Sequence, residues 1–138
     1  MTEPRTYAGA LARLRQSGLR PTRQRLALAR LLFEAGDRHV TAEGLRGEAE
    51  AAGVRVSLAT VYNTLHQFTG AGLLREVVVD AARSYFDTNV TDHHHFFFER
   101  SGQLQDIPGA GIQVSGLPVP PSGVEVARVE VVVRLRHK

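Results

Sequence analysis

The chain has 138 residues, 43% hydrophobic and 22% charged, so it is long enough to bury a core and is not a disordered tail. It has no cysteine, which excludes disulfides and a structural zinc site of the cysteine type, and its formal net charge is +3. No apolar run approaches the roughly 20 residues of a membrane span, and the N-terminal segment lacks the pattern of a signal peptide. These features predict a cytoplasmic protein with no membrane partner.

The basic residues are concentrated at one end of the chain. Residues 1–30 contain seven arginines and one glutamate, 7 − 1 = +6, so the remainder sums to 3 − 6 = −3. Clustered arginines release condensed counterions when they neutralise phosphates, so this asymmetry favours a polyanionic partner. A solvated basic helix face explains the same charge distribution equally well.

Three helices are predicted before residue 54, each followed by a glycine that ends it. Apolar residues recur at helical spacing within each of them. Thr22 and Thr41 precede the second and third helices and are expected to cap their first turns. The predicted helices span residues 7–16, 23–35 and 42–52.

A fourth helix is expected after Ser57, in the run "VSLATVYNTLHQFTGAGLL", and it carries two stripes. The core-facing stripe is apolar and comprises Leu58, Val61, Leu65 and Phe68. The outward stripe is polar and nearly uncharged, with Tyr62 beside it, and comprises Thr60, Asn63, Thr64 and Gln67. Amide and hydroxyl groups can bind base edges and phosphates, whereas an ordinary solvent face would carry Lys and Glu.

The third and fourth helices are separated by a short break and therefore have helix-turn-helix order. The fourth helix is then the expected reader of the DNA major groove. An unremarkable polar helix face is the alternative interpretation. The candidate DNA-binding residues are Arg20, Arg23, Ser57, Thr60, Tyr62, Asn63 and Thr64.

After the fourth helix the apolar period changes to that of strands. Residues 73–79 and 83–87 predict a two-stranded wing, so residues 1–86 are interpreted as a winged helix-turn-helix DNA-binding domain. Residues 87–138 are interpreted as a dimerisation and metal- or haem-sensing domain. It should contain a hairpin turning near Ser101 and a half-buried strand over 124–136. So small a sheet is not expected to be stable alone, which predicts a homodimer.

The run "TDHHHFFFE" places three histidines directly before three phenylalanines. In a strand, His93 and His95 share a face and can converge on one ion at about 2.1 Å, while His94 points to the other face. Alternatively, His93, His94 or His95 is an axial ligand to haem iron, with the phenylalanines against the macrocycle. The phenylalanines are explained equally well as buried sheet core.

Several motifs together resemble the ferric uptake regulator family of bacterial metalloregulators. They are "RPTRQRLALARLL", "RHVTAEGLRGEAEAAG", "VSLATVYNTLHQFTGAGLL" and "RSYFDT" ahead of "DHHH", and they extend from about Leu11 to His95. The triplet, "DIP" and the closing "VARVEVVVRLR" resemble more narrowly the iron response regulator branch, in which haem is the signal. The resemblance implies an α+β protein, with an N-terminal winged helix-turn-helix followed by a small α/β dimerisation domain.

The resemblance also implies a metal site at the hinge between these domains. Matched position by position, its ligands are His39, Asp87, His93 and His95, which would hold Fe²⁺, Mn²⁺ or Zn²⁺. Departures from the family pattern are Ser101 in place of a zinc-site cysteine, Val129 in place of a second-site histidine, and Asn63 in place of a common arginine.

The expected function is therefore transcription regulation of iron- or haem-related genes, through an A·T-rich palindromic operator. Binding to DNA would be modulated by haem or a divalent metal, and the haem-responsive branch makes the free form the expected DNA binder. An enzyme is not expected, although a small non-haem metalloenzyme could use the same His/Asp cluster. A sequence-independent DNA-binding protein is the other alternative.

Overall fold

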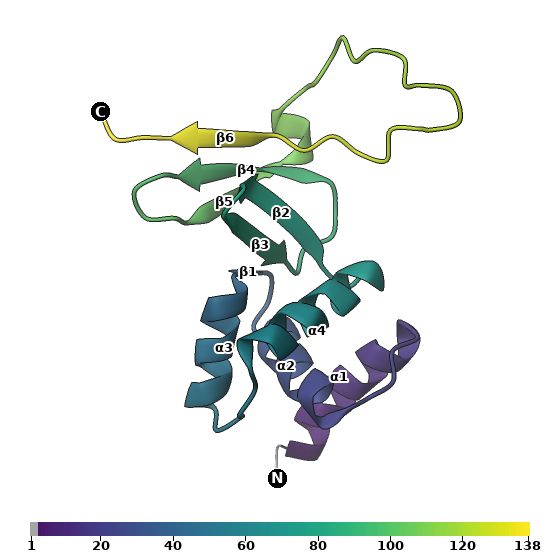
Figure 1. Ribbon diagram of the computed structural model, residues 1–138, viewed down its shortest axis with the longest axis vertical. Helices are drawn as coiled ribbons and strands as arrows, with labels where there is room; N and C mark the ends of the chain where they lie inside the picture. Colours follow the sequence, from purple (N-terminus) through teal and green to yellow (C-terminus); the bar gives the residue numbers. More distant parts are fainter. Residues whose placement is uncertain (1–2) are drawn as a thin grey trace. The chain divides into compact units, whose positions relative to one another are not determined.

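Two compact units, Met1–Val90 and Thr91–Lys138, make up the computed structural model, which describes residues 3–138 (Figure 1). Residues 1 and 2 of the predicted first domain lie outside the described residues. The division follows Val90 and not residue 86, because Asp87 still belongs to a strand of the first unit. Helices and a sheet form the first unit and a second sheet forms the other, so the fold class is α+β, as predicted.

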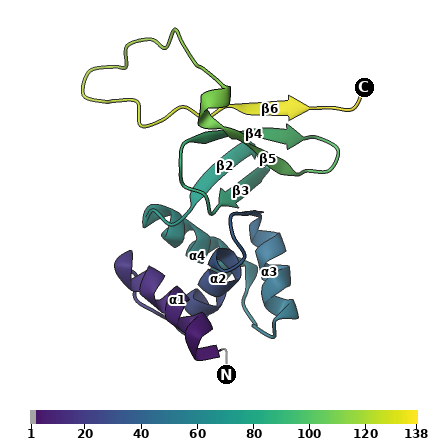
Figure 2. The same ribbon diagram turned by 180° about the vertical axis from the view of Figure 1, so that it is seen from behind.

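Within residues 3–90 the helices come first and a strand pair last. The elements in order are α1 (Glu3–Gln16), α2 (Arg23–Phe33), β1 (His39–Val40), α3 (Ala42–Ala51), α4 (Leu58–Gly70), β2 (Arg75–Asp80) and β3 (Arg83–Asp87). Figure 2 shows α1 beside α2. Helix α3 is in contact with both α2 and α4. The predicted helices and the β2–β3 pair are confirmed, whereas the short strand β1 was not predicted.

Helices α2, α3 and α4 each begin at a hydroxyl cap, as the sequence predicts. In each case the side-chain oxygen accepts a hydrogen bond from a backbone N–H three residues further on. Thr22 accepts from Arg25 at 3.2 Å, Thr41 from Gly44 at 3.0 Å, and Ser57 from Thr60 at 3.1 Å. Each cap satisfies a donor that the helix itself leaves unpaired, and contributes about 1 kcal/mol.

The core of the first unit lies between the helices and Phe86 of β3. Its fully buried members include Leu14, Leu28, Leu32, Leu45, Val61, Leu65, Phe68 and Phe86. On α4 the buried positions are 61, 64, 65 and 68, the i, i+3, i+4, i+7 pattern of one helix face. This face fixes which side of α4 is left for solvent or a partner.

The sheet of the first unit has the order β1-β3-β2, with antiparallel neighbours. β1 is only two residues long, and it places His39 directly opposite Asp87 and Val40 opposite Phe86. Its brevity explains why the sequence did not predict it, since two residues carry no periodicity. Its register brings two of the predicted ligands together.

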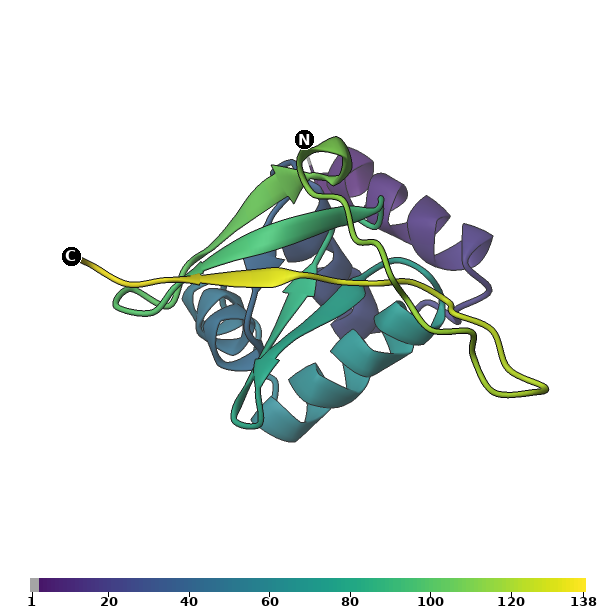
Figure 3. The same ribbon diagram turned by 90° about the horizontal axis from the view of Figure 1, so that it is seen from above.

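The second unit is a three-stranded sheet with the order β5-β4-β6, which is clear from above in Figure 3. β4 (His93–Phe98) pairs with β5 (Leu104–Pro108) in antiparallel fashion and with β6 (Val132–Leu135) in parallel. The predicted hairpin is therefore confirmed. The helical part of this unit, within residues 91–138, is the 3-10 turn η1 (Gly109–Gly111), so the expected α-helical contribution is small.

The strand predicted over 124–136 is wrong for most of its length, because only Val132–Leu135 is a strand. Residue 132 pairs with His95, and β4 begins at His93. Residues before 130 therefore extend beyond the end of β4 and have no strand of the unit to pair with. They belong to an irregular segment, residues 112–131, whose exposed apolar side chains are Val114, Leu117, Val119, Val124 and Val126.

Among the helices of residues 3–138, none is long and apolar enough to cross a membrane.

Candidate metal centre and nucleic-acid interface

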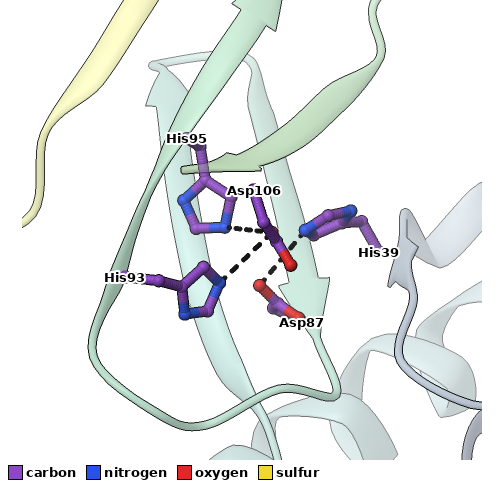
Figure 4. A group of neighbouring side chains, drawn as sticks. All are labelled: His39, Asp87, His93, His95 and Asp106. Atoms are coloured by element: carbon purple, nitrogen blue, oxygen red, sulfur yellow. Dashed lines mark ion pairs between the residues drawn. The ribbon is translucent and has the colours of Figure 1, made fainter. Parts of the chain in front are cut away.

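Two predicted ligands, His39 and Asp87, form an ion pair in the first unit (Figure 4). Nε2 of His39 lies 3.2 Å from Oδ2 of Asp87, whose side chain is 1% exposed. The other oxygen, Oδ1, accepts a hydrogen bond from the Asn89 N–H at 2.9 Å. A buried carboxylate needs such partners to remain charged. The pair is therefore held in a fixed position by the pairing of β1 with β3.

The neighbouring residue Arg38 fastens this pair to the helices. Its backbone N–H donates to Oγ1 of Thr88 at 2.9 Å, and the Thr88 N–H donates back to the Arg38 carbonyl at 3.0 Å. Its guanidinium donates to both carboxylate oxygens of Glu48 on α3 and, at 3.1 Å, to the carbonyl of Leu31 on α2. The backbone that carries His39 is thus joined to both α2 and α3.

In the second unit, the predicted His93 and His95 lie with Asp106 as side chains that could hold a metal ion. The two histidines lie on one face of β4, as expected, and their rings are 4.5 Å apart. Asp106 lies opposite His95 in β5, and its Oδ1 is 3.3 Å from Nε2 of each histidine. Figure 4 marks both contacts. Both histidines are buried, with side chains 4% and 1% exposed, so water competes little for their two Nε2 atoms.

A hydrogen bond fixes the tautomer of His93. Its Nδ1 lies 2.6 Å from the carbonyl oxygen of Thr91. A carbonyl can only accept, so Nδ1 carries the proton, and in the neutral ring the Nε2 lone pair points at the Asp106 carboxylate. A lone pair facing a carboxylate is repulsive unless a cation lies between them, either a metal ion or a proton on Nε2. This is the arrangement in which metal-ligating histidines occur, with the remote nitrogen bound to a backbone carbonyl.

His94 has the opposite arrangement. Its Nδ1 accepts a hydrogen bond of 3.0 Å from the backbone N–H of Val131. An amide can only donate, so Nδ1 has no proton and the neutral ring carries its proton on Nε2. The three consecutive histidines therefore do not form one uniform set of ligands.

The chemistry of the two ligand groups fits a divalent ion. One group has one imidazole and the other has two, each combined with a carboxylate, and such nitrogen and oxygen donors suit Fe²⁺, Mn²⁺ or Zn²⁺. Asp106 was not predicted as a ligand, although it lies in the "DIP" motif. The sequence feature that could have identified it is the register of the hairpin, because the β4–β5 pairing places Asp106 opposite His95.

The outward face of α4 is narrower than predicted. Tyr62 and Asn63 are exposed and Thr60 is partly so, but Thr64 is only 4% exposed and belongs to the core-facing side. The prediction that Thr64 lies on the outward stripe is wrong, because positions 61, 64, 65 and 68 are the buried side of this helix. Ser57 is exposed and its hydroxyl, besides capping α4, donates to Oγ1 of Thr60 at 2.9 Å.

Arg20 and Arg25 lie on one side of the polar face of α4. Arg20 and Arg23, both predicted DNA-binding residues, are exposed before and at the start of α2. Arg25, which was not predicted, donates two hydrogen bonds to Oε1 of Gln67, at 3.2 and 2.9 Å, and one to the carbonyl of Arg20 at 2.7 Å. These contacts join α2 to α4 around a hollow of about 360 Å³ that Asn63 also lines.

Tyr62 shares a contact with α3. Its hydroxyl lies 3.3 Å from one carboxylate oxygen of Glu43. Partial desolvation raises the pKa of Tyr62, and the negative charge of Glu43 and the hydrogen bond to it raise the pKa further. The phenol therefore stays neutral and can act as a hydrogen-bond donor.

Comparison with known proteins shows the class to which the chain belongs. The Ferric uptake regulator family matches residues 16–133, so the protein belongs to that family. The Staphylococcus aureus protein named Peroxide-responsive repressor PerR is 34% identical over 97 residues, which are 70% of this chain and 65% of that protein. The chain therefore spans about two thirds of the length of the curated relatives it matches.

Solved structures of the family have the same fold. The Ferric uptake regulator from Pseudomonas aeruginosa with manganese has a TM-score of 0.71 and 27% identity, over 94% of this chain and 98% of that one. The Ferric uptake regulator from Francisella tularensis with iron has a TM-score of 0.70 and 20% identity, over 88% and 93% of the two chains. The predicted family is confirmed, while the iron response regulator branch stays a prediction.

Proposed function

We propose that the protein is a DNA-binding transcriptional regulator whose affinity for its operator depends on a divalent metal ion. The observation that carries the metal proposal is the group of His93, His95 and Asp106, whose ligand atoms lie within 4.8 Å of one another. The His93 tautomer supports it, because the Nε2 lone pair is directed at the carboxylate. Membership of the ferric uptake regulator family supports the regulatory role.

We propose further that His39 and Asp87 bind the same ion as the group in the second unit. Neither group alone supplies the five or six donors that Fe²⁺ or Mn²⁺ commonly takes, whereas together they offer five residues. When bound, the ion would supply positive charge to carboxylates and imidazoles of both units. Binding of the ion would then favour one arrangement of the units over others. A ligand that shifts such an equilibrium changes the affinity of another site, here the affinity for DNA.

The proposed DNA contacts are on the outward face of α4 and the arginines beside it. Thr60, Tyr62 and Asn63 would meet base edges or phosphates, and Arg20 and Arg23 would neutralise phosphates. Ser57 would fix the start of α4 and also contact the phosphate backbone of the DNA. A homodimer would present two such faces to the two halves of an A·T-rich palindrome. The regulated genes would be those of iron or haem handling.

Haem is the second candidate ligand implied by the resemblance to the iron response regulator branch. Phe97, one of the three phenylalanines, is completely buried and therefore already belongs to the sheet core. A metalloenzyme could use the same ligands, but the helices of the first unit have helix-turn-helix order, which favours DNA binding. We therefore propose the divalent ion as the ligand and regulation as the role.

One titration tests these proposals together. The full chain is titrated with Mn²⁺, Zn²⁺ and haemin while absorbance, heat of binding and anisotropy of a labelled A·T-rich palindrome are followed at one salt concentration. A scrambled duplex is the control for sequence-independent binding. The expected result is saturable binding of Mn²⁺ or Zn²⁺ that changes the affinity for the palindrome more than for the scrambled duplex.

Variants separate the parts of the proposal. His93→Ala should abolish the metal response and leave a folded chain that binds the palindrome. His39→Ala should also lower the affinity for the ion, because the proposed ion has ligands in both units. Unchanged Mn²⁺ affinity in His39→Ala would contradict the joined site but not the site in the second unit. Equal affinity for the palindrome and the scrambled duplex, with and without metal, would contradict the proposal that the protein is a sequence-specific regulator.

A further inference from the structure

We propose that His94 is a positioning residue that caps the start of β6 on β4, and that it is not a ligand for metal or haem iron. The observation is the hydrogen bond of 3.0 Å from the Val131 N–H to Nδ1 of His94. It joins residues 37 positions apart in the sequence. No property of the proposed metal centre is needed for this inference.

The bond takes the place of the next rung of the parallel ladder. Strand β6 is bound to β4 from Val131 onward, since the His95 N–H donates to the Val131 carbonyl at 3.1 Å. In a continued parallel ladder the Val131 N–H would donate to a backbone carbonyl of β4. Nδ1 of His94 accepts that hydrogen bond instead, and the strand begins at the next residue, Val132.

The position matters because Val131 ends the irregular segment. Residues 112–131 contain no strand, and β6 itself is only four residues long. Both backbone polar groups of Val131 are bound to β4, one by the His94 ring and one by the His95 backbone. His94 therefore fixes where the segment stops and the sheet starts, as a hydroxyl cap fixes the start of a helix.

The same bond sets which histidines can ligate. Binding through Nε2 needs a lone pair there, and His93 has it because its Nδ1 proton is held by the Thr91 carbonyl. His94 has its proton on Nε2, because its Nδ1 accepts from Val131. Ligation by His94 would require the Val131 bond to break. The triplet is thus divided between two ligand histidines and one that holds a strand.

The test compares His94→Leu, which removes the acceptor, with His94→Asn, whose side-chain oxygen can replace Nδ1 and which lacks Nε2. His137→Leu is the control for losing an exposed imidazole of the same unit. Three measurements are made on the full chain without added metal: long-range ¹H–¹⁵N spectra of the histidine rings, hydrogen exchange of the Val131 amide, and circular dichroism. Mn²⁺ and haemin are then titrated into each variant.

We expect the ring spectra to assign Nε2–H to His94 and Nδ1–H to His93. Exchange of the Val131 amide should rise about tenfold in His94→Leu, as loss of one hydrogen bond predicts, and stay within about threefold of the parent in His94→Asn and His137→Leu. Mn²⁺ and haemin affinities should stay within about twofold in His94→Asn. The capping role of His94 would be overturned if exchange of the Val131 amide is unchanged in His94→Leu, or if the spectra place the His94 ring proton on Nδ1.

A fall of about tenfold or more in Mn²⁺ or haemin affinity in His94→Asn, with Val131 exchange preserved, would overturn the exclusion of His94 as a ligand. If His94→Leu does not fold, the ring spectra of the parent and the exchange of His94→Asn still decide. Absence of metal binding in every protein, with the expected tautomer and exchange, would contradict the proposed function and leave the cap intact.

Discussion

Replacing Asp106 by Asn tests the metal centre most directly. The change keeps the size and shape of the side chain but removes the charge, and Oδ1 of Asp106 lies 3.3 Å from Nε2 of both His93 and His95. Without metal the effect on stability should be small, because the side chain is 36% exposed and ion pairs of this kind contribute at most about 1 kcal/mol. With metal the effect should be large.

The size follows from binding linkage. Loss of a residue that only supports the ligands of a metal ion commonly lowers affinity about 10- to 100-fold, and loss of a ligand should cost at least as much. At an ion concentration about 100 times the parent Kd, the ion adds about 2.7 kcal/mol to the free energy of unfolding of the parent. A 100-fold weaker variant gains only RT ln 2, about 0.4 kcal/mol, and a 10-fold weaker one about 1.4 kcal/mol.

The assay is urea denaturation of parent and variant with and without Mn²⁺, supported by calorimetric titration. Asp92→Asn is the matched control, since it removes the same charge from an exposed position beside His93. It should keep nearly the full metal-dependent gain. If Asp106→Asn gains as much stability from Mn²⁺ as Asp92→Asn does, Asp106 is not a ligand and the reasoning from the His93 tautomer fails.

Further predictions concern DNA binding and the fold. Tyr62→Ala and Asn63→Ala should each weaken binding of the palindrome by about 1 to 3 kcal/mol in anisotropy titrations, whereas Thr64→Val should not, because Thr64 is buried. Arg23→Ala should weaken binding to all duplexes alike and make the plot of log affinity against log salt less steep. Glu43→Gln should lower the pKa of Tyr62, measured by ultraviolet titration, because it removes the charge that helps to raise it. Phe68→Ala should lower the free energy of unfolding by about 3 to 5 kcal/mol in urea, since Phe68 is fully buried, and an effect below about 1 kcal/mol would contradict its place in the core.

The helical half of the protein was predictable because its signals are local. Each hydroxyl cap, glycine stop and apolar stripe acts within a few residues, so the starts of α2, α3 and α4 follow from the sequence. Thr64 shows the limit of this reasoning. A threonine is compatible with either face of a helix, and only packing against the other helices decides that it is buried.

The sheets were less predictable because their signals are not local. The strand expected over 124–136 alternates well, yet it is a strand only where β4 lies beside it. Likewise His93 and His95 were predicted from their spacing, but Asp106 depends on a register that a turn near Ser101 leaves uncertain by a residue or two. A shift of one residue would turn Asp106 to the other face of β5.

The contacts of the first unit suggest why the proposed ligand His39 lies where it does. The pairing of β1 with β3 holds His39 opposite Asp87. The preceding residue, Arg38, binds Glu48 on α3 and the carbonyl of Leu31 on α2 through its guanidinium. The next residues, Val40 and the cap Thr41, lead directly into α3. A ligand that fixes the His39 side chain therefore acts on a backbone that is already part of the helix-turn-helix. No flexible linker separates the proposed sensor residue from the proposed DNA-binding helices, so metal-dependent changes in the position of His39 would be transmitted to α3 by covalent structure as well as by the Arg38–Glu48 pair.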